Sequence, residues 1–383
     1  MSEYQYYEWQ TIGRLLTPEE QMEVDDLSSH IDVSGNRAVV TYNWGDFRHD
    51  PKQVLLTYFD AFFYCANWGT LQLMFRFPTG LLNKETISLY CDGAMVSFET
   101  IGDFDILDLD FFEEGYLREG WLEAECSLSG FLSLYDDLLT GDCRLLYLAW
   151  LGVNTFYNKF EDKLYEDFHL TNNPTLEPPV PPGLDELSAS LQYFVRVFNV
   201  NQFLLSAAAE QSTTLIKTPE IDYNHLVLLL NETERNNFLV DFAEGKPGTA
   251  QSLRNRLSTF IPSKKTAGGD NRRSIHQLET RATQIKETED LLFAEFSREM
   301  YKAEMDSLAL RENQIWEEVE HLIEHGRRGS SVYDQITQQL KELAELAVYR
   351  HTCSEFESRI EILAAKYPNR RALIRRWQDE GWL

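Results

Sequence analysis

Apolar and polar positions follow two different periods in the first part of the chain. Several short segments alternate between the two classes and are rich in aromatic and β-branched residues, a pattern typical of strands. Segments with helical spacing lie between them. The predicted strands are Tyr4–Gln10, Ala38–Trp44, Leu71–Phe77, Ala94–Glu99 and Phe104–Phe112.

Three of the intervening segments begin with residues that favour a helix start. Thr17 is followed by proline and by Glu20, Asp50 is followed by proline, and Asn83 precedes a short apolar stretch. Their side chains can accept hydrogen bonds from the free N–H groups of a first helical turn. The second helix is expected to include the apolar stretch Val54–Ala66. Strands joined through helices predict an α+β protein, with an amino-terminal mixed α/β sandwich near the ferredoxin-like class followed by helical domains.

The strand pattern ends near residue 113, and helical spacing takes over. One segment interrupts it, Leu176–Gly183, whose four prolines predict an extended linker. We expect short helices before and after this linker. They are Phe131–Leu139, Cys143–Leu151, Leu184–Phe198, Asn201–Glu210, Tyr223–Asn231, Thr233–Glu244 and Ala250–Phe260.

A second linker, residues 261–274, is rich in Gly, Lys and Arg, and a long helical pattern follows it. The segment Ile275–His325 contains neither Gly nor Pro and is rich in helix-forming residues. The pattern leaves open whether this is one unbroken helix. Its heptad frame carries Leu292 and Phe296 but also acidic residues such as Glu299, which a strict coiled coil would not place there.

Residues 331–383 carry narrow apolar stripes, each one helical face wide, so they must pack against each other. The bundle that this predicts is centred on Tyr333, Leu340, Leu343, Phe356, Leu363 and Trp377, with Trp316 covering one end. Together these patterns predict three domains. They are an acidic α/β head with trailing helices at 1–175, a helical domain at 184–260, and a long helix with a carboxyl-terminal bundle at 275–383.

Charge divides the chain more sharply than hydrophobicity does. Residues 1–250 hold 40 Asp and Glu against 14 Lys and Arg, whereas residues 251–383 hold 22 against 21. An acidic surface repels phosphate backbones and anionic membranes. The five cysteines form no CxxC pair, and the longest apolar run, Leu145–Val153, is too short to span a bilayer. We therefore expect a soluble, cytoplasmic protein with reduced thiols.

Short segments of the chain resemble an uncharacterised bacterial protein family. They are Ser2–Ile12 (SEYQYYEWQTI), Tyr42–Trp44, Ala66–Gly69 and the closing helices. The closing segment Lys366–Leu383 also resembles the carboxyl ends of some bacterial zinc-finger proteins of the SWIM type, but this chain has no Cys/His ligand set for zinc. The first resemblance implies a bacterial protein, and neither implies an activity.

Two groups of residues have the spacing of metal ligands. Asp108 and Asp110 lie on one face of a predicted strand, as in phosphoryl-transfer sites that hold Mg²⁺. The alternative is the solvent face of an edge strand, where charge deters aggregation. His321, Glu324 and His325 match the H-x-x-E-H pattern, in which two histidines four residues apart share a zinc ion. The alternative for these histidines is a favourable interaction with the carboxyl end of a helix.

A third group lies where a predicted strand turns into a helix. Loops at the ends of strands bind ligands in open sheets, so Trp44, Asp46, Arg48 and His49 form a candidate binding site. No nucleophile elbow, P-loop or dinucleotide motif is present. These observations favour a non-enzymatic interaction or adaptor protein that binds another protein, needs no cofactor and does not bind membranes.

Two other functions stay open. One is a metal-dependent hydrolase or phosphoryl-transfer enzyme that uses the acidic or histidine groups above. The other is a nucleic-acid contact through the basic hinge 251–286, which has eight basic and two acidic residues. We do not expect the latter, because no aromatic residue lies between Ile261 and His276 for base stacking. Self-association through 275–383 also stays open.

Overall fold

The computed structural model of the chain describes residues 4–111, 127–157, 176–215, 223–246, 249–258, 260, 272–326 and 329–383. The chain divides into two compact units, residues 1–286 and 287–383. The division falls within one helix, α12 (Ile275–His325).

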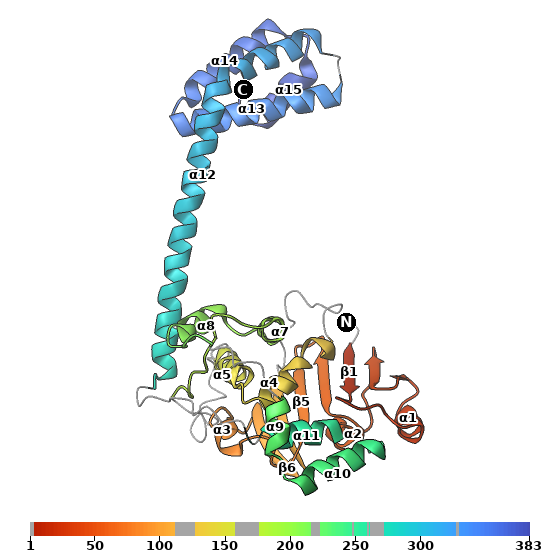
Figure 1. Cartoon of the computed structure of the whole chain (residues 1–383). Helices are drawn as coiled ribbons and strands as arrows, with labels where there is room; N and C mark the ends of the chain where they lie inside the picture. Colours follow the sequence, from red (N-terminus) through yellow and green to blue (C-terminus); the bar gives the residue numbers. More distant parts are fainter. Residues whose placement is uncertain are drawn as a thin grey trace. The chain divides into compact units, whose positions relative to one another are not determined.

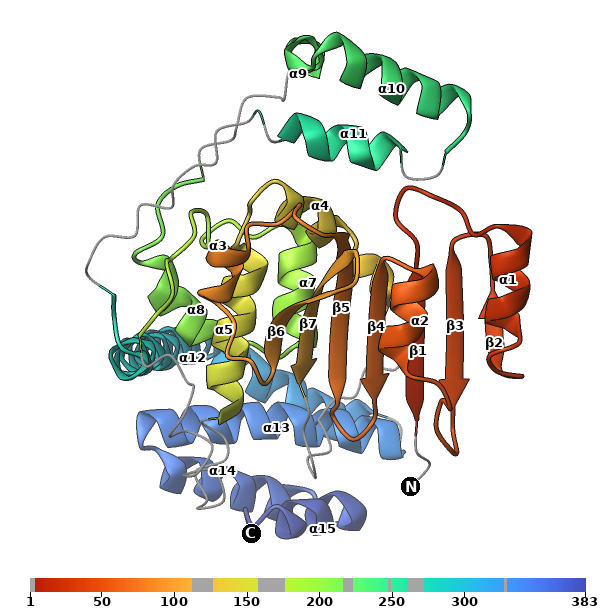
Figure 2. The same cartoon turned by 90° about the horizontal axis from the view of Figure 1, so that it is seen from below.

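Seven strands form a single sheet in the first unit, in the order β2-β3-β1-β4-β5-β7-β6. Each pair of neighbouring strands in this sheet is antiparallel (Figures 1 and 2). The α+β class is confirmed. The hairpins β2–β3, β4–β5 and β6–β7 join neighbours directly, so the strand order differs from the split βαβ order of a ferredoxin-like sheet. The strands are β1 (Gln5–Gln10), β2 (Ile31–Val33), β3 (Arg37–Tyr42), β4 (Ala61–Ala66), β5 (Leu71–Pro78), β6 (Val96–Ile101) and β7 (Phe104–Phe111).

Helices make up most of the rest of the described chain. The helices near the sheet are α1 (Pro18–Asp25), α2 (Pro51–Tyr58), α3 (Lys84–Ser88), η1 (Leu128–Gly130), α4 (Ser133–Leu139), α5 (Arg144–Tyr157), α7 (Ala189–Val197) and α8 (Gln202–Ala209). They are followed by α9 (Tyr223–Leu229), α10 (Glu232–Ala243), α11 (Thr249–Ser258) and α12, and then by α13 (Ser330–Arg350), α14 (Cys353–Lys366) and α15 (Arg371–Asp379).

The three predicted helix starts are confirmed. Thr17 and Glu20 form a reciprocal capping box at the start of α1. The carboxylate of Asp50 accepts a hydrogen bond from the backbone N–H of Lys52, and Asn83 caps α3 in the same manner. In each case a short polar side chain satisfies an N–H group that the helix itself leaves free.

The prediction that Val54–Ala66 lies in one helix is wrong beyond its first turns. Helix α2 ends at Tyr58, the backbone turns at Asp60, and strand β4 begins at Ala61. Most side chains of β4 are buried, on both faces of the strand. The period-2 pattern that would have revealed the strand is therefore missing.

The sheet has a core on each face. On one face Phe63, Leu73 and Leu109 pack with residues of α4, α5, α7 and α8. On the other face a row of side chains, Trp9, Phe62 and Met74, packs with α2. Because α7 and α8 belong to the first core, they lie in the same compact unit as the sheet. The domain boundaries predicted from the two linkers, which separate 1–175, 184–260 and 275–383, stay a prediction.

The proline-rich segment Leu176–Gly183 packs within the first unit and is not an exposed spacer. Tyr90 donates a hydrogen bond to the carbonyl oxygen of Pro179 (2.8 Å). Leu176 forms a β-bridge with Ser274, so the two predicted linkers lie side by side at this point. The side chain of Glu177 is 2% exposed.

The second unit is a helical bundle formed by the later part of α12 with α13, α14 and α15. The residues predicted for its centre are all buried there, and Trp316 packs against Phe356 with ring centroids 5.8 Å apart. Helix α12 ends at His325, just before Gly326, as expected from the glycines. The bundle prediction is confirmed.

Candidate interaction surface

Helix α12 runs without interruption from Ile275 to His325. At its start the N–H of Gln277 donates to Oγ of Ser274 (3.2 Å), and the N–H of Ser274 donates to Oε1 of Gln277 (2.8 Å). This reciprocal cap satisfies two backbone donors. The absence of Gly and Pro from the segment explains why the helix continues for 51 residues.

The two ends of α12 are buried in different cores. Leu278 and Ala282 belong to the core of the first unit. Ile315, Val319 and Ile323 belong to the core of the second. Packing of these apolar faces stabilises the ends of the helix, because intrinsic propensity alone contributes little to helix stability in water.

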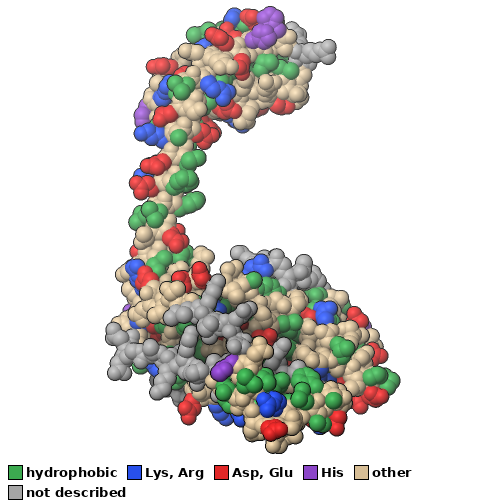
Figure 3. Space-filling model, viewed as in Figure 1, with side chains coloured by type: hydrophobic (Ala, Val, Ile, Leu, Met, Phe, Trp, Pro, Cys, Tyr) green, Lys and Arg blue, Asp and Glu red, His purple; other side chains and the backbone are tan. Residues whose placement is uncertain are grey.

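The middle of α12 has no such covering. Every residue from Lys286 to Glu304 is exposed. Within it Leu292, Phe293, Phe296 and Met300 are exposed to 60%, 73%, 61% and 56%. At about 100° per residue these four side chains lie on one side of the helix, and we call them the α12 stripe. Figure 3 shows hydrophobic side chains along this part of the helix.

Isolated exposed apolar side chains are ordinary on protein surfaces. Four large ones that adjoin each other on one helical face are not, and such patches mark docking sites. Leu310, which is also exposed, lies on the same side of the helix. The stripe therefore has the composition of an interface centre, with two aromatic side chains and a methionine.

Three exposed carboxylates share the side of the helix on which the stripe lies. They belong to Glu289, Glu299 and Asp306. Within the described residues none of the three is in an ion pair. The apolar stripe is therefore bordered and interrupted by negative charge that the chain's own described residues do not neutralise.

The predicted loop site is held by contacts within the chain. Gln5 donates from Nε2 to the carboxylate of Asp46 (2.8 Å) and to the carbonyl oxygen of Gly45 (2.9 Å). The ring of His49 packs 5.6 Å from that of the buried Phe47. Trp44 is 73% exposed. The four residues are close in sequence, but the contacts of Asp46 and His49 lead to Gln5 and Phe47 and do not join the four side chains into one site.

Asp108 and Asp110 lie on the face of β7 that α2 covers. The Asp108 carboxylate pairs with Nζ of Lys52 (2.9 Å) and accepts a hydrogen bond from Nε2 of Gln72 (2.9 Å). Burial and the neighbouring Asp108 carboxylate raise the pKa of Asp110 to about 6. The edge-strand alternative is wrong, because β7 lies between β5 and β6 and Asp108 is buried.

His321 and His325 stack on one side of α12, with ring centroids 4.8 Å apart. The carboxylate of Glu324 is already engaged by two other side chains. It accepts a hydrogen bond from the hydroxyl of Tyr367 (2.5 Å) and pairs with Nζ of Lys366 (3.4 Å), and these contacts lower the pKa of its carboxyl. Within the described residues no group of three His, Cys, Asp or Glu side chains is arranged to hold a metal ion.

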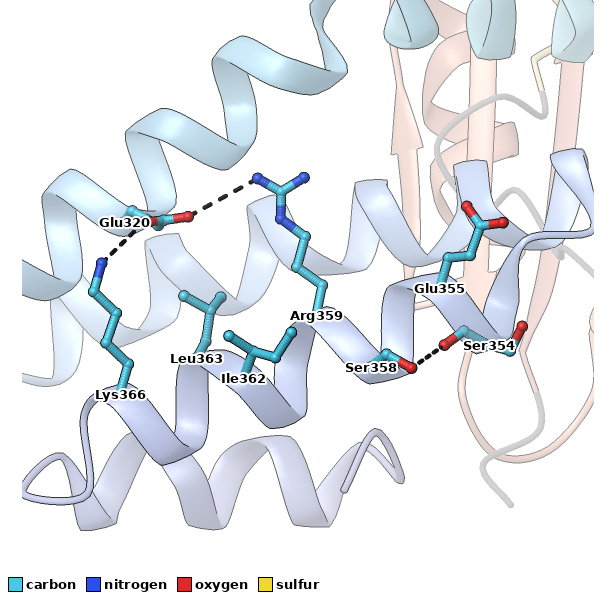
Figure 4. Close-up of a pocket in the computed structure, with 8 residues that line it drawn as sticks. All are labelled: Glu320, Ser354, Glu355, Ser358, Arg359, Ile362, Leu363 and Lys366. Carbon is cyan, nitrogen blue, oxygen red and sulfur yellow. Dashed lines mark hydrogen bonds and ion pairs between the residues drawn. The ribbon is translucent and has the colours of Figure 1, made fainter.

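A shallow groove of about 640 Å³ lies on the second unit, along α14 (Figure 4). Its charged side chains pair with each other, since Glu320 contacts Lys366 at 3.3 Å and Arg359 at 3.9 Å. The hydroxyl of Ser358 donates to the backbone oxygen of Ser354 and faces no base. Glu355 also lines the groove, and no described residue pairs with its carboxylate. The groove therefore offers a ligand one unpaired carboxylate but no activated nucleophile.

Several basic side chains of the hinge 251–286 contact acidic residues of the chain itself. Arg256 pairs with Glu234 at 2.9 Å, Arg273 with Glu177 at 2.6 Å, and Arg281 with Glu210 at 2.6 Å. Paired guanidinium groups contribute less to the attraction of phosphate. Lys264 and Lys265 lie outside the described residues.

Sequence reasoning recorded Leu292 and Phe296 as members of a heptad frame but did not identify them as a site. The spacing indicates an apolar helical face. The structure adds that no described residue of the chain covers that face. Comparison of the chain with protein-family models, curated proteins and solved structures found no match. Among the described residues no helix is both long and apolar enough to cross a membrane.

Proposed function

We propose that the protein is a non-enzymatic adaptor that binds another protein through the α12 stripe. The observation that carries this proposal is the exposure of Leu292, Phe293, Phe296 and Met300 on one side of a helix whose two ends are buried. An exposed apolar helical face is what helix-in-groove and helix-on-helix recognition use. Covering it removes large apolar side chains from water, which favours association.

The two other functions have less support. The carboxylate of Asp108 already binds Lys52 and Gln72, and Glu324 binds Lys366 and Tyr367. A divalent ion at either place would have to displace these contacts. For nucleic acid, three of the arginines in the basic hinge are paired with Glu side chains. No specific observation favours either function over protein binding.

A photo-crosslinking experiment tests the proposal. A benzoylphenylalanine residue is placed at Phe296, and in a matched variant at Ala294, in the full chain expressed in cells of the source organism. The two positions are both exposed but lie about 200° apart around the helix. We expect a defined adduct from position 296, none from 294, and loss of the adduct when Leu292 and Met300 are replaced by Ser. Equal adducts from both positions, or none from either, would contradict the proposal.

A further inference from the structure

The residues that face the same way as the stripe contain acids but no bases. In the heptad frame these positions are Glu289, Leu292, Phe296, Glu299, Ala303, Asp306 and Leu310. Three of the seven are acidic, and the other four are apolar. If two copies of α12 paired along this face, no register could place a base of one face opposite a carboxylate of the other.

The positions that border this face do little to change that balance. Between residues 287 and 314 they are Thr288, Phe293, Glu295, Met300, Lys302, Ser307, Ala309 and Gln314. Lys302 is the only base among them. In a parallel pair the three carboxylates would each meet their own counterpart, and in antiparallel pairs they would meet apolar side chains or each other. Burial of unpaired carboxylates opposes association, so this face is poorly suited to self-pairing.

We propose that the occupant of the α12 stripe is an amphipathic helix of a different protein, whose apolar seam is bordered by Lys and Arg. This inference rests on the proposed function and specifies its partner. The apolar side chains of that helix cover Leu292, Phe293, Phe296 and Met300. Its long Lys and Arg side chains, which border the apolar seam, reach across to the carboxylates of Glu289, Glu299 and Asp306, whereas a second copy of the stripe offers only Lys302. The carboxylates thus favour a basic partner and disfavour a second copy of the chain.

Two synthetic helical peptides test this partner chemistry on the full chain. Both have the same leucine seam over three heptads, bordered by Lys in one peptide and by Glu in the other. We expect the Lys peptide to bind, its affinity to fall steeply with salt, and the Glu peptide not to bind. Failure of the Lys peptide to bind at low salt, or equal binding of both peptides, would overturn the proposal.

A pair of charge-matched triple variants locates the effect. In the first, Glu289→Gln, Glu299→Gln and Asp306→Asn neutralise the face of the stripe, and the Lys peptide should bind about tenfold more weakly. In the second, Glu287→Gln, Asp290→Asn and Asp32→Asn make the same change of net charge away from the stripe, the first two on the other side of α12 and the third in β2, and binding should change much less. Equal weakening in both variants would mean that net charge alone attracts the peptide, which contradicts the proposal.

Sedimentation equilibrium tests the other half of the proposal, the exclusion of a second copy. The triple variant Glu289→Leu, Glu299→Leu and Asp306→Leu should self-associate, whereas the wild type should not associate through this face. A wild-type oligomer that Phe296→Ser disrupts would show that the occupant is a second copy. The outcomes separate the two proposals: a position-specific adduct at 296 without preference for the Lys peptide leaves the adaptor function standing and removes only the basic partner.

Discussion

Arg273 and Glu177, 96 residues apart in sequence, form a two-point ion pair. Nε of Arg273 lies 2.7 Å from Oε2 of Glu177, and Nη2 lies 2.6 Å from Oε1. The hydroxyl of Tyr147 donates to the same carboxylate, and Nη1 of Arg273 donates to the carbonyl oxygen of Ala207 (2.7 Å). The pair therefore joins the start of the long helix to the proline-rich segment and to α5 and α8.

Breaking this pair should destabilise the first unit. In the Glu177→Gln variant the mostly buried guanidinium of Arg273 loses its counter-charge, and the free energy of unfolding should fall by about 3 kcal/mol. The exposed pair of Arg281 and Glu210 provides the control, since Glu210→Gln should cost at most about 1 kcal/mol. Urea unfolding followed by circular dichroism measures both. Similar losses in the two variants would mean that the Arg273 pair is not buried in solution.

The raised pKa of Asp110 predicts a pH-dependent stability. The carboxyl has a pKa of about 6 in the folded chain, against a usual value of 3.8, so the folded state binds this proton more tightly. Protonation therefore favours the folded state, and its contribution is lost as pH rises from about 4 to about 6. Asp110→Asn should be more stable than wild type by about 1–2 kcal/mol at pH 7, and the gain should disappear near pH 4.

The control for this experiment is Asp103→Asn, in the exposed turn between β6 and β7. The difference in stability between this variant and wild type is the baseline against which the gain from Asp110→Asn is judged at each pH. A gain from Asp110→Asn that persists at pH 4 would point to packing or to helix and strand propensity, and not to the ionisation of this carboxyl.

The bundle of the second unit should depend on Leu343. This side chain is buried among the residues of α12, α13 and α14, so Leu343→Ala should cost about 2–5 kcal/mol. Val348→Ala, at an exposed position of the same helix, should change stability by less than about 0.5 kcal/mol. Hydrogen exchange resolved by peptide should show faster exchange in 330–383 for the first variant, with residues 4–111 unchanged. Faster exchange in both regions would mean that the two units unfold together.

The stripe should contribute nothing to the stability of the isolated chain. Phe296→Ala removes an exposed ring and introduces a better helix former, so the melting temperature should stay the same or rise slightly. Phe356→Ala, which removes a buried ring from the bundle, should cost about 3–5 kcal/mol. Differential scanning calorimetry compares the two. A clear loss of stability in Phe296→Ala would show that the ring packs within the chain.

Local chemistry made the helix starts and the bundle predictable. Thr17, Asp50 and Asn83 act on N–H groups two or three residues away, so their effect can be read from short stretches of sequence. The bundle followed from the 3-4 spacing of residues such as Leu340 and Leu343, which leaves one apolar face per helix.

Strand β4 and the proline-rich segment show where such reasoning fails. Ala61–Ala66 is buried on both sides, so its pattern matches that of a buried helix, and the spatial neighbours that decide between the two are β1 and β5. The four prolines of Leu176–Gly183 predict a linker, but not that Glu177 would find a buried partner near residue 273. Likewise, the spacing of Leu292 and Phe296 specifies an apolar helical face without specifying what covers it.

The pairing of Leu176 with Ser274 has a consequence for how this chain can change in evolution. The N–H of Gly183 also bonds to the carbonyl oxygen of Thr213 (2.8 Å), so the stretch between Thr213 and Arg273 begins and ends beside the same proline-rich segment. Helices α9, α10 and α11 lie within this excursion and have a small core of their own. Since lengthening a closed loop costs little entropy, this is a place where the chain can gain, lose or exchange a segment while the sheet and the start of α12 keep their contacts.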